Sequence, residues 1–198
     1  QVGLASIILP QMSADLQRRT LLEITKVATE VLNAAGAQLV GGHTTMGAEL
    51  TIGFTVTGTK NSMPLTIAGA KHGDALILTR PIGSGVILAA DMLGQAEGHD
   101  VAATLAIMGQ PQDREAAVLS TVAHAMTDVT GFGLAGHVHA MCQASGLDAH
   151  LFQDAIPTYP GARALSDAGV SSTLMPENYT DAPVNGLHDA LLYDPQTA

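Results

Sequence analysis

The segment from Ala125 to His137 reads Ala-Met-Thr-Asp-Val-Thr-Gly-Phe-Gly-Leu-Ala-Gly-His and carries the strongest signal in the chain. Asp128 lies between two threonines, just ahead of a Gly-Phe-Gly turn and an apolar pattern typical of a helix. Glycines allow close approach of a ligand, and the first turn of a helix offers free N–H groups. A carboxylate here can bind a hard cation such as Mg²⁺, which can in turn bind phosphate. The alternative is that Asp128 only caps the helix.

A second glycine-rich segment, Val40 to Gly58, reads Val-Gly-Gly-His-Thr-Thr-Met-Gly-Ala-Glu-Leu-Thr-Ile-Gly-Phe-Thr-Val-Thr-Gly. Its paired glycines, Gly41 and Gly42, permit unusual dihedral angles and a close ligand. The segment lacks the Gly-Lys-Ser/Thr ending of a Walker A loop. From the residues alone, an ordinary turn and a ligand-binding loop both stay open.

These segments resemble the selenophosphate synthetases (selenide, water dikinases), a family of the aminoimidazole ribonucleotide synthetase-like superfamily. The first matches the family's Thr-Asp-Val-Thr-Gly-Phe-Gly-Leu-x-Gly-His string, and the second its Gly-Gly-His-Ser/Thr segment with the following strand. A third, Leu191 to Thr197, reads Leu-Leu-Tyr-Asp-Pro-Gln-Thr. It matches the family's Leu-Leu-x-Asp-Pro-Gln-Thr-Ser-Gly-Gly up to its glycines. Three motifs in the family's order and spacing are far more specific than any one of them.

The resemblance implies a mixed α/β (α+β) fold of two domains. Residues 1–60 would be the C-terminal part of an ATP-binding and dimerisation domain, and residues 66–198 most of a C-terminal α/β domain. The implied reaction makes selenophosphate, AMP and phosphate from selenide, ATP and water, with ATP and Mg²⁺ as cofactors and a homodimer as the assembly. Asp128 carries over as a Mg²⁺ ligand. The residues that carry over to the nucleotide are Gly41, Gly42, His43 and Thr44, with Glu49 matching the pattern more loosely.

The family's upstream segment has no match in this chain. That segment supplies a glycine-rich loop, a lysine, further metal carboxylates and a cysteine or selenocysteine, and neither Cys142 nor any lysine here fits it. The sequence also begins inside an apolar run without a methionine. We therefore expect an internal piece of a longer enzyme, inactive alone and binding Mg²⁺ weakly or not at all.

Composition narrows the function classes. The net charge of −10 argues against nonspecific binding to nucleic acid or to an anionic membrane. No apolar stretch is long enough to span a bilayer, and the first residues lack the pattern of a signal peptide. Cys142 is the single cysteine, which excludes an internal disulfide and fits a reducing compartment such as the cytoplasm. We expect it to be a buried structural thiol.

Hydrophobic periodicity predicts alternating helices and strands without internal repeats. The expected helices cover 13–35, the stretch from the 80–85 turn through 93, 101–108, 113–124, 133–144, the stretch up to 168, and 186–193. The expected strands are 37–40, 50–57, 75–79 (buried) and 148–151, with loops at 41–49 and 170–186 and a linker at 59–64.

Three further patterns carry weaker signals. Arg80 to Gly85, Arg-Pro-Ile-Gly-Ser-Gly, is either an anion cradle or a strand-to-helix turn, and it resembles the family's Lys-Pro-Leu-Gly-x-Gly with arginine for lysine. His137 and His139 are two residues apart and face different sides of a helix, so they do not form a zinc pair. The Asp194-Pro195-Gln196-Thr197 stretch is expected to be a structural turn.

Two alternatives to a selenide, water dikinase stay open. One is another superfamily member: aminoimidazole ribonucleotide synthetase, thiamine-monophosphate kinase or a hydrogenase-maturation ATPase. The other is a noncatalytic module that binds nucleotide or dimerises. Fold alone does not separate these possibilities.

Overall fold

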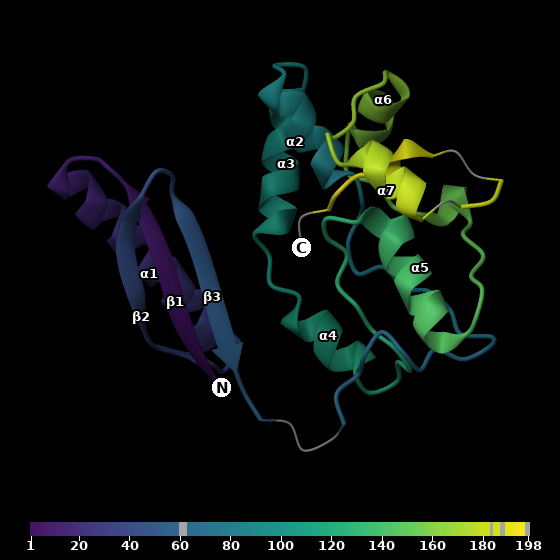
Figure 1. Cartoon of the computed structure of the whole chain (residues 1–198), viewed down its shortest axis with the longest axis horizontal. Helices are drawn as coiled ribbons and strands as arrows, with labels where there is room; N and C mark the ends of the chain where they lie inside the picture. The colour runs from purple at the N-terminus through teal and green to yellow at the C-terminus, as the bar shows by residue number, and fades with distance from the viewer. Residues whose placement is uncertain (60–62, 183, 187–188, 197–198) are drawn as a thin grey trace. The chain divides into compact units, whose positions relative to one another are not determined.

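The chain, described by a computed structural model, consists of two compact units, Gln1–Pro64 and Leu65–Ala198 (Figure 1). The structure describes residues 1–59, 63–182, 184–186 and 189–196. The first unit holds one small sheet and a long helix, and the second is built mainly from helices. The mixed α/β class expected from the sequence is confirmed.

The first unit is a three-stranded sheet with one helix on one face. Its strands are β1 (Val2–Pro10), β2 (Gln38–Gly47) and β3 (Thr51–Thr57), in the order β2-β1-β3. β1 runs parallel to β2 and antiparallel to β3. Alternate residues of β1 are buried, and Leu21 and Ile24 of helix α1 (Ala14–Ala34) pack against that buried side. The helix therefore covers the face of the sheet that carries the buried side chains of the central strand.

The predicted helix at 13–35 is confirmed. Ser13 caps α1, because its side chain accepts a hydrogen bond from the Leu16 amide. Gly36, at φ 74°, follows the helix in the left-handed conformation that ends many helices. The predicted strand at 50–57 is confirmed as β3.

Two predictions for the first unit were wrong. The predicted loop 41–49 is strand as far as Gly47, because β2 keeps its pairing with β1 across the glycines. Pairing with a neighbour outweighs the low strand preference of glycine here. The central strand β1 was missed altogether, since its first residues were interpreted only as an apolar run.

The second unit packs short helices around a core. Four predicted helices are confirmed: the helix that follows the 80–85 turn, those at 101–108 and 133–144, and the helix that ends near 168. The helix predicted at 113–124 ends earlier than expected. Helix α7 (Met175–Asp181) lies inside the predicted loop 170–186. Of the helix predicted at 186–193, the described part shows only η2 (Ala190–Leu192), with residues 187 and 188 outside the described residues. The elements are α2 (Ser84–Met92), α3 (Gly98–Met108), α4 (Asp113–Leu119), α5 (Gly133–Ser145), η1 (Gln153–Ala155), α6 (Ala162–Asp167), α7 (Met175–Asp181) and η2 (Ala190–Leu192).

The strands predicted for the second unit were wrong. Residues 75–79 were expected to form a buried strand, but they are irregular, with Leu76 and Ile77 at least half exposed. Residues 148–151 are irregular too. Within the described part of the chain no strand runs beside either segment, and a strand needs a hydrogen-bonded neighbour.

The core of the second unit is organised around the Leu-Leu-Tyr motif. Leu191, Leu192 and Tyr193 are fully buried and pack with Ile82 and Ile87 of the α2 region. Cys142 is half-buried rather than buried, and burial raises the pKa of its thiol. None of the helices formed by the described residues has both the length and the apolar character needed to cross a bilayer.

Candidate functional site

Asp128 lies on an irregular stretch between α4 and α5, with its side chain exposed to solvent. The interpretation of Asp128 as a helix cap was wrong, because α5 begins at Gly133 and Phe132 occupies the cap position. The Thr127 hydroxyl donates a long hydrogen bond to the Asp128 carboxylate at 3.4 Å. The carboxylate is therefore accessible to a ligand from solution.

His137 holds the segment that follows Asp128. Its Nε2 accepts a hydrogen bond from the Thr130 amide at 3.0 Å and lies 3.3 Å from the Thr130 hydroxyl. The ring of Phe132 packs beside the imidazole, with 5.9 Å between the ring centroids. The last residue of the signature thus binds back onto the turn that precedes its own helix.

The C-terminal motif completes this support. Asn178 of α7, buried, donates from Nδ2 to the carbonyl oxygens of Gly131 at 2.8 Å and Tyr193 at 2.7 Å. The Gln196 amide donates to the Thr130 carbonyl oxygen at 2.9 Å. Gly133, at φ 67°, leaves no room for a side chain, since a Cβ would lie 2.7 Å from the Leu192 carbonyl oxygen. The first and third motifs of the sequence are therefore in direct contact.

The side chain of Gln196 occupies the suspected anion cradle at the start of α2. Its Oε1 accepts hydrogen bonds from the Gly83 amide at 2.7 Å and from the Ser84 amide and hydroxyl at 3.2 Å. The amides at this helix start are thus bound within the chain, and the turn interpretation of residues 80–85 holds. Arg80 donates to the Met108 carbonyl oxygen at 3.4 Å. Asp194-Pro195-Gln196 is a structural segment that joins α2 to the signature.

Asp194 is a buried carboxyl within that segment. Its Oδ1 accepts a hydrogen bond from the Ser172 amide at 2.7 Å, while Oδ2 has no hydrogen-bond partner within the described residues. Burial raises the pKa of Asp194 to about 6, against the lowering effect of the Ser172 amide.

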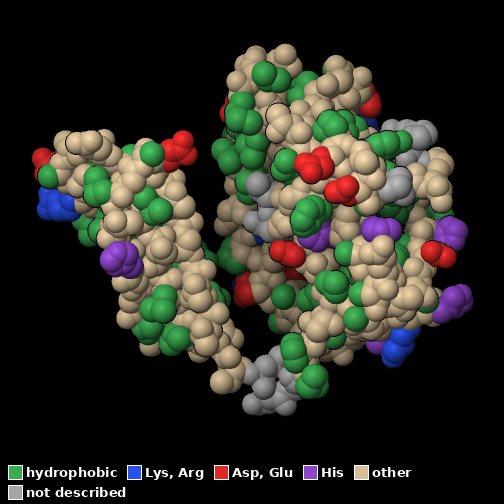
Figure 2. Space-filling model, viewed as in Figure 1, with side chains coloured by type: hydrophobic (Ala, Val, Ile, Leu, Met, Phe, Trp, Pro, Cys, Tyr) green, Lys and Arg blue, Asp and Glu red, His purple; other side chains and the backbone are tan. Residues whose placement is uncertain are grey.

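The donor set suits a Mg²⁺ ion only in part. Carboxylate oxygen is the ligand that Mg²⁺ prefers, and Asp128 offers one in an accessible place. Within the described residues no three His, Cys, Asp or Glu side chains lie close enough to share a metal. Asp, Glu and His side chains are scattered over the visible face of the second unit, where basic side chains are sparse (Figure 2). A complete site needs oxygen ligands beyond Asp128.

The four nucleotide candidates lie together on β2. They line a cavity of about 420 Å³ bordered by β1, β2 and α1. A neighbouring cavity of about 350 Å³ shares Thr44 and includes Arg18 in its lining. Glu49 is exposed in the bend between β2 and β3. The lining of the larger cavity includes Gly41, Gly42, His43 and Thr44.

Gly41 and Gly42 have different structural constraints. A Cβ at Gly42 would overlap the Ala5 carbonyl oxygen on the neighbouring strand. A Cβ at Gly41 would make an ordinary contact with Leu4 Cδ2 at 3.6 Å. The fold thus requires glycine at Gly42, whereas nothing in the described sheet requires it at Gly41.

Sequence reasoning missed the residues that support the signature. Asn178 lies in a stretch predicted as loop, and His137 was considered only as a zinc ligand. Both bind main-chain groups, His137 seven residues before it and Asn178 in distant segments, and such contacts leave no periodic pattern. Gln196 could have been identified from the sequence, because it lies in the Leu-Leu-Tyr-Asp-Pro-Gln-Thr motif.

The profile of the family described as AIR synthase related protein, C-terminal domain, matches residues 71–172. The selenide, water dikinase of Dechloromonas aromatica (strain RCB) is 34% identical over 194 residues, which cover 92% of this chain and 56% of that protein. The chain thus spans about half the length of the curated relatives it matches.

Solved structures share the fold at lower identity. Hydrogenase maturation protein HypE in complex with ATP superposes with a TM-score of 0.69 at 19% identity, covering 100% of this chain and 54% of that one. Thiamine-monophosphate kinase from Stenotrophomonas maltophilia gives a TM-score of 0.64 at 19% identity, covering 96% and 58%. At this identity the likeness shows the two-unit fold and nothing finer.

Proposed function

The chain belongs to the AIR synthase-related family, and we propose that it is part of a selenide, water dikinase. The proposed reaction forms selenophosphate, AMP and phosphate from selenide, ATP and water. The observation that carries this proposal is the 34% identity to a selenide, water dikinase along 92% of the chain. The signature around Asp128 lies within residues 71–172, which the family model matches.

We assign the two units to different tasks. Residues 1–60 are the end of an ATP-binding and dimerisation domain, in which Gly41, Gly42, His43 and Thr44 contact the nucleotide. The cavity that these residues line supports this assignment. Residues 66–198 are most of the C-terminal α/β domain. The active assembly is a homodimer in the cytoplasm.

In this proposal Asp128 is a Mg²⁺ ligand. Its exposure and the rigid support of the following turn suit a carboxylate that meets a Mg²⁺–nucleotide complex. Bound Mg²⁺ would neutralise charge on the phosphates, and this chain's residues would hold the Asp128 carboxylate in place. The remaining ligands come from the ATP phosphates and from segments outside this chain.

We expect the isolated chain to be inactive, because it has no match to the family's nucleophile and lysine. The other superfamily activities are less favoured, since HypE and thiamine-monophosphate kinase share only 19% identity with the chain. A noncatalytic module would bind ATP without turnover.

The test is product analysis of the complete protein that contains this chain. The protein is incubated with ATP, Mg²⁺ and selenide, and ³¹P NMR follows the phosphorus-containing products. Selenophosphate together with AMP and phosphate supports the proposal. The proposal is rejected if the protein forms ADP from ATP when thiamine monophosphate is added in place of selenide. It is also rejected if the protein binds ATP and forms no product. The 198-residue chain, tested in parallel, is expected to give no product.

A further inference from the structure

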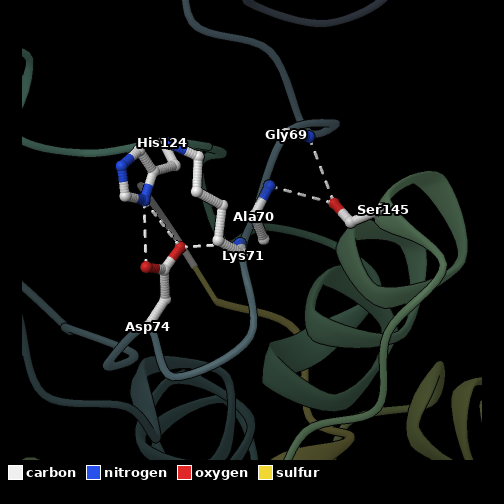
Figure 3. A network of polar contacts seen from close by, with 6 residues as sticks. All are labelled: Gly69, Ala70, Lys71, Asp74, His124 and Ser145. Carbon is white, nitrogen blue, oxygen red and sulfur yellow. Dashed lines mark hydrogen bonds and ion pairs between the residues drawn. The ribbon is translucent and has the colours of Figure 1, made fainter.

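Residues 66–74, here called the strap, run alongside the segment that carries Asp128. The strap has no regular secondary structure and follows directly on the first unit in the sequence. Figure 3 shows its polar contacts with two distant parts of the second unit, one at His124 and one at Ser145. His124 directly precedes the signature in the sequence, and Ser145 is the last residue of its helix α5.

The first contact holds the chain just before Asp128. Both carboxylate oxygens of Asp74 lie 2.9 Å from Nδ1 of His124 (Figure 3). Close by, the Met126 amide donates to the Thr66 carbonyl oxygen at 2.9 Å. These contacts fix the main chain at positions 124 and 126, four and two residues before Asp128.

Glycine is required where the strap passes His124. Gly69 has φ 116°, a conformation that side-chain-bearing residues rarely adopt. A Cβ there would lie 2.8 Å from the His124 carbonyl oxygen. The main chain of the strap therefore packs directly against the main chain at His124, just before the signature.

The second contact holds the far end of α5. The Ser145 hydroxyl accepts hydrogen bonds from the amides of Gly69 and Ala70, each at 3.2 Å (Figure 3). One short segment thus binds both the entry to the signature and the end of the helix that follows it.

The Asp74 side chain is itself held within the strap. Its Oδ2 accepts a hydrogen bond from the Lys71 amide at 2.8 Å. That backbone hydrogen bond, and after it the His124 contact, lowers the pKa of Asp74 below its ordinary value. The carboxylate is thus ionised and oriented toward the imidazole at neutral pH.

We propose that Asp74 and His124 are positioning residues for Asp128. Asp74 and His124 hold the main chain before Asp128, and His137 and Gln196 hold the main chain after it. The exposed carboxylate therefore lies on a stretch that is restrained at both ends. This inference rests on the proposed function, in which Asp128 binds the cation. Neither Asp74 nor His124 needs to touch the nucleotide.

Hydrogen–deuterium exchange of the 198-residue chain tests the restraint without any activity. Asp74→Ala should speed exchange of the amides at 125–130 by roughly twofold to fivefold, as expected for loss of a part-exposed charged contact. Gly69→Ala should speed it further, because it forces the whole strap away. The matched control is His99→Ala, which removes another His–carboxylate contact, to Asp100 in α3. Unchanged exchange at 125–130 in both strap variants overturns the proposal.

Mg²⁺ titration of the complete enzyme tests the link to the cation. Asp74→Ala should raise the Mg²⁺ concentration for half-maximal turnover. Asp74→Asn should restore most of the wild-type value, since its amide oxygen can accept from both Lys71 and His124. An unchanged Mg²⁺ requirement in Asp74→Ala overturns the positioning role. If the complete protein shows no selenide-dependent turnover, the proposed function is rejected instead. The hydrogen–deuterium exchange result would still decide whether the strap orders residues 125–130.

Discussion

Replacing Asn178 with alanine should destabilise the second unit through the support of the signature. Asn178 is buried, and its Nδ2 donates to two carbonyl oxygens, those of Gly131 and Tyr193. The alanine variant leaves both acceptors without this donor in a protein interior. At about 1–2 kcal/mol for each such group, the free energy of unfolding should fall by about 2–4 kcal/mol.

Thermal unfolding followed by circular dichroism measures this effect. For a unit of this size the loss corresponds to a decrease in Tm of roughly 6–15 °C. Asn185→Ala is the matched control, because Asn185 is exposed and should change the Tm by no more than about 2 °C. If both variants lose the same small amount, the signature is not held by Asn178 and the reasoning fails.

Three further substitutions test single features of the structure. Burial raises the pKa of Asp194 to about 6 from an ordinary 3.8, so its contribution is fully present below about pH 4 and is lost as the pH rises to about 6. Urea unfolding should therefore show wild-type stability falling by about 3 kcal/mol across that window relative to Asp194→Asn, and parallel pH profiles would contradict this. Gly42→Ala should destabilise the first unit by about 1–3 kcal/mol through overlap with Ala5, whereas Gly41→Ala should leave its unfolding unchanged. Calorimetry on the complete protein should show weaker ATP binding for Gly41→Ala, and equal ATP affinity would remove Gly41 from the nucleotide site.

Local sequence patterns predicted the helices well and the sheet poorly. The periodicity that predicted the helix at 13–35 is a local signal, and it was confirmed as α1, with Ser13 as its cap and Gly36 after its end. The path of β2 through Gly41 and Gly42 depends on pairing with β1, which is distant in the sequence. Pairing of this kind is decided by tertiary contacts rather than by residue preference.

The strand predicted at 75–79 is the opposite case, in which the residues favour a strand but pairing is missing. Its apolar run has the right residues, but the described chain offers it no neighbouring strand. Leu76 and Ile77 are exposed as a result.

The candidate site shows the same division between local and distant information. The motif order identified the signature and placed Asp128 on it. The contacts that hold it in place, from Asn178 and Gln196, join segments tens of residues apart and could not be found from spacing. Sequence motifs thus identified candidate residues, and the structure shows what supports one of them.

The most direct test of the central claim is the effect of Asp128→Asn on selenophosphate formation by the complete protein, measured by ³¹P NMR in the presence of Mg²⁺, ATP and selenide. Asp154→Asn, at an exposed position on η1, is the control. The account predicts that Asp128→Asn abolishes formation of selenophosphate and AMP, while the control keeps wild-type turnover. Full activity of Asp128→Asn would contradict the assignment of Asp128 as the cation ligand of a selenide, water dikinase.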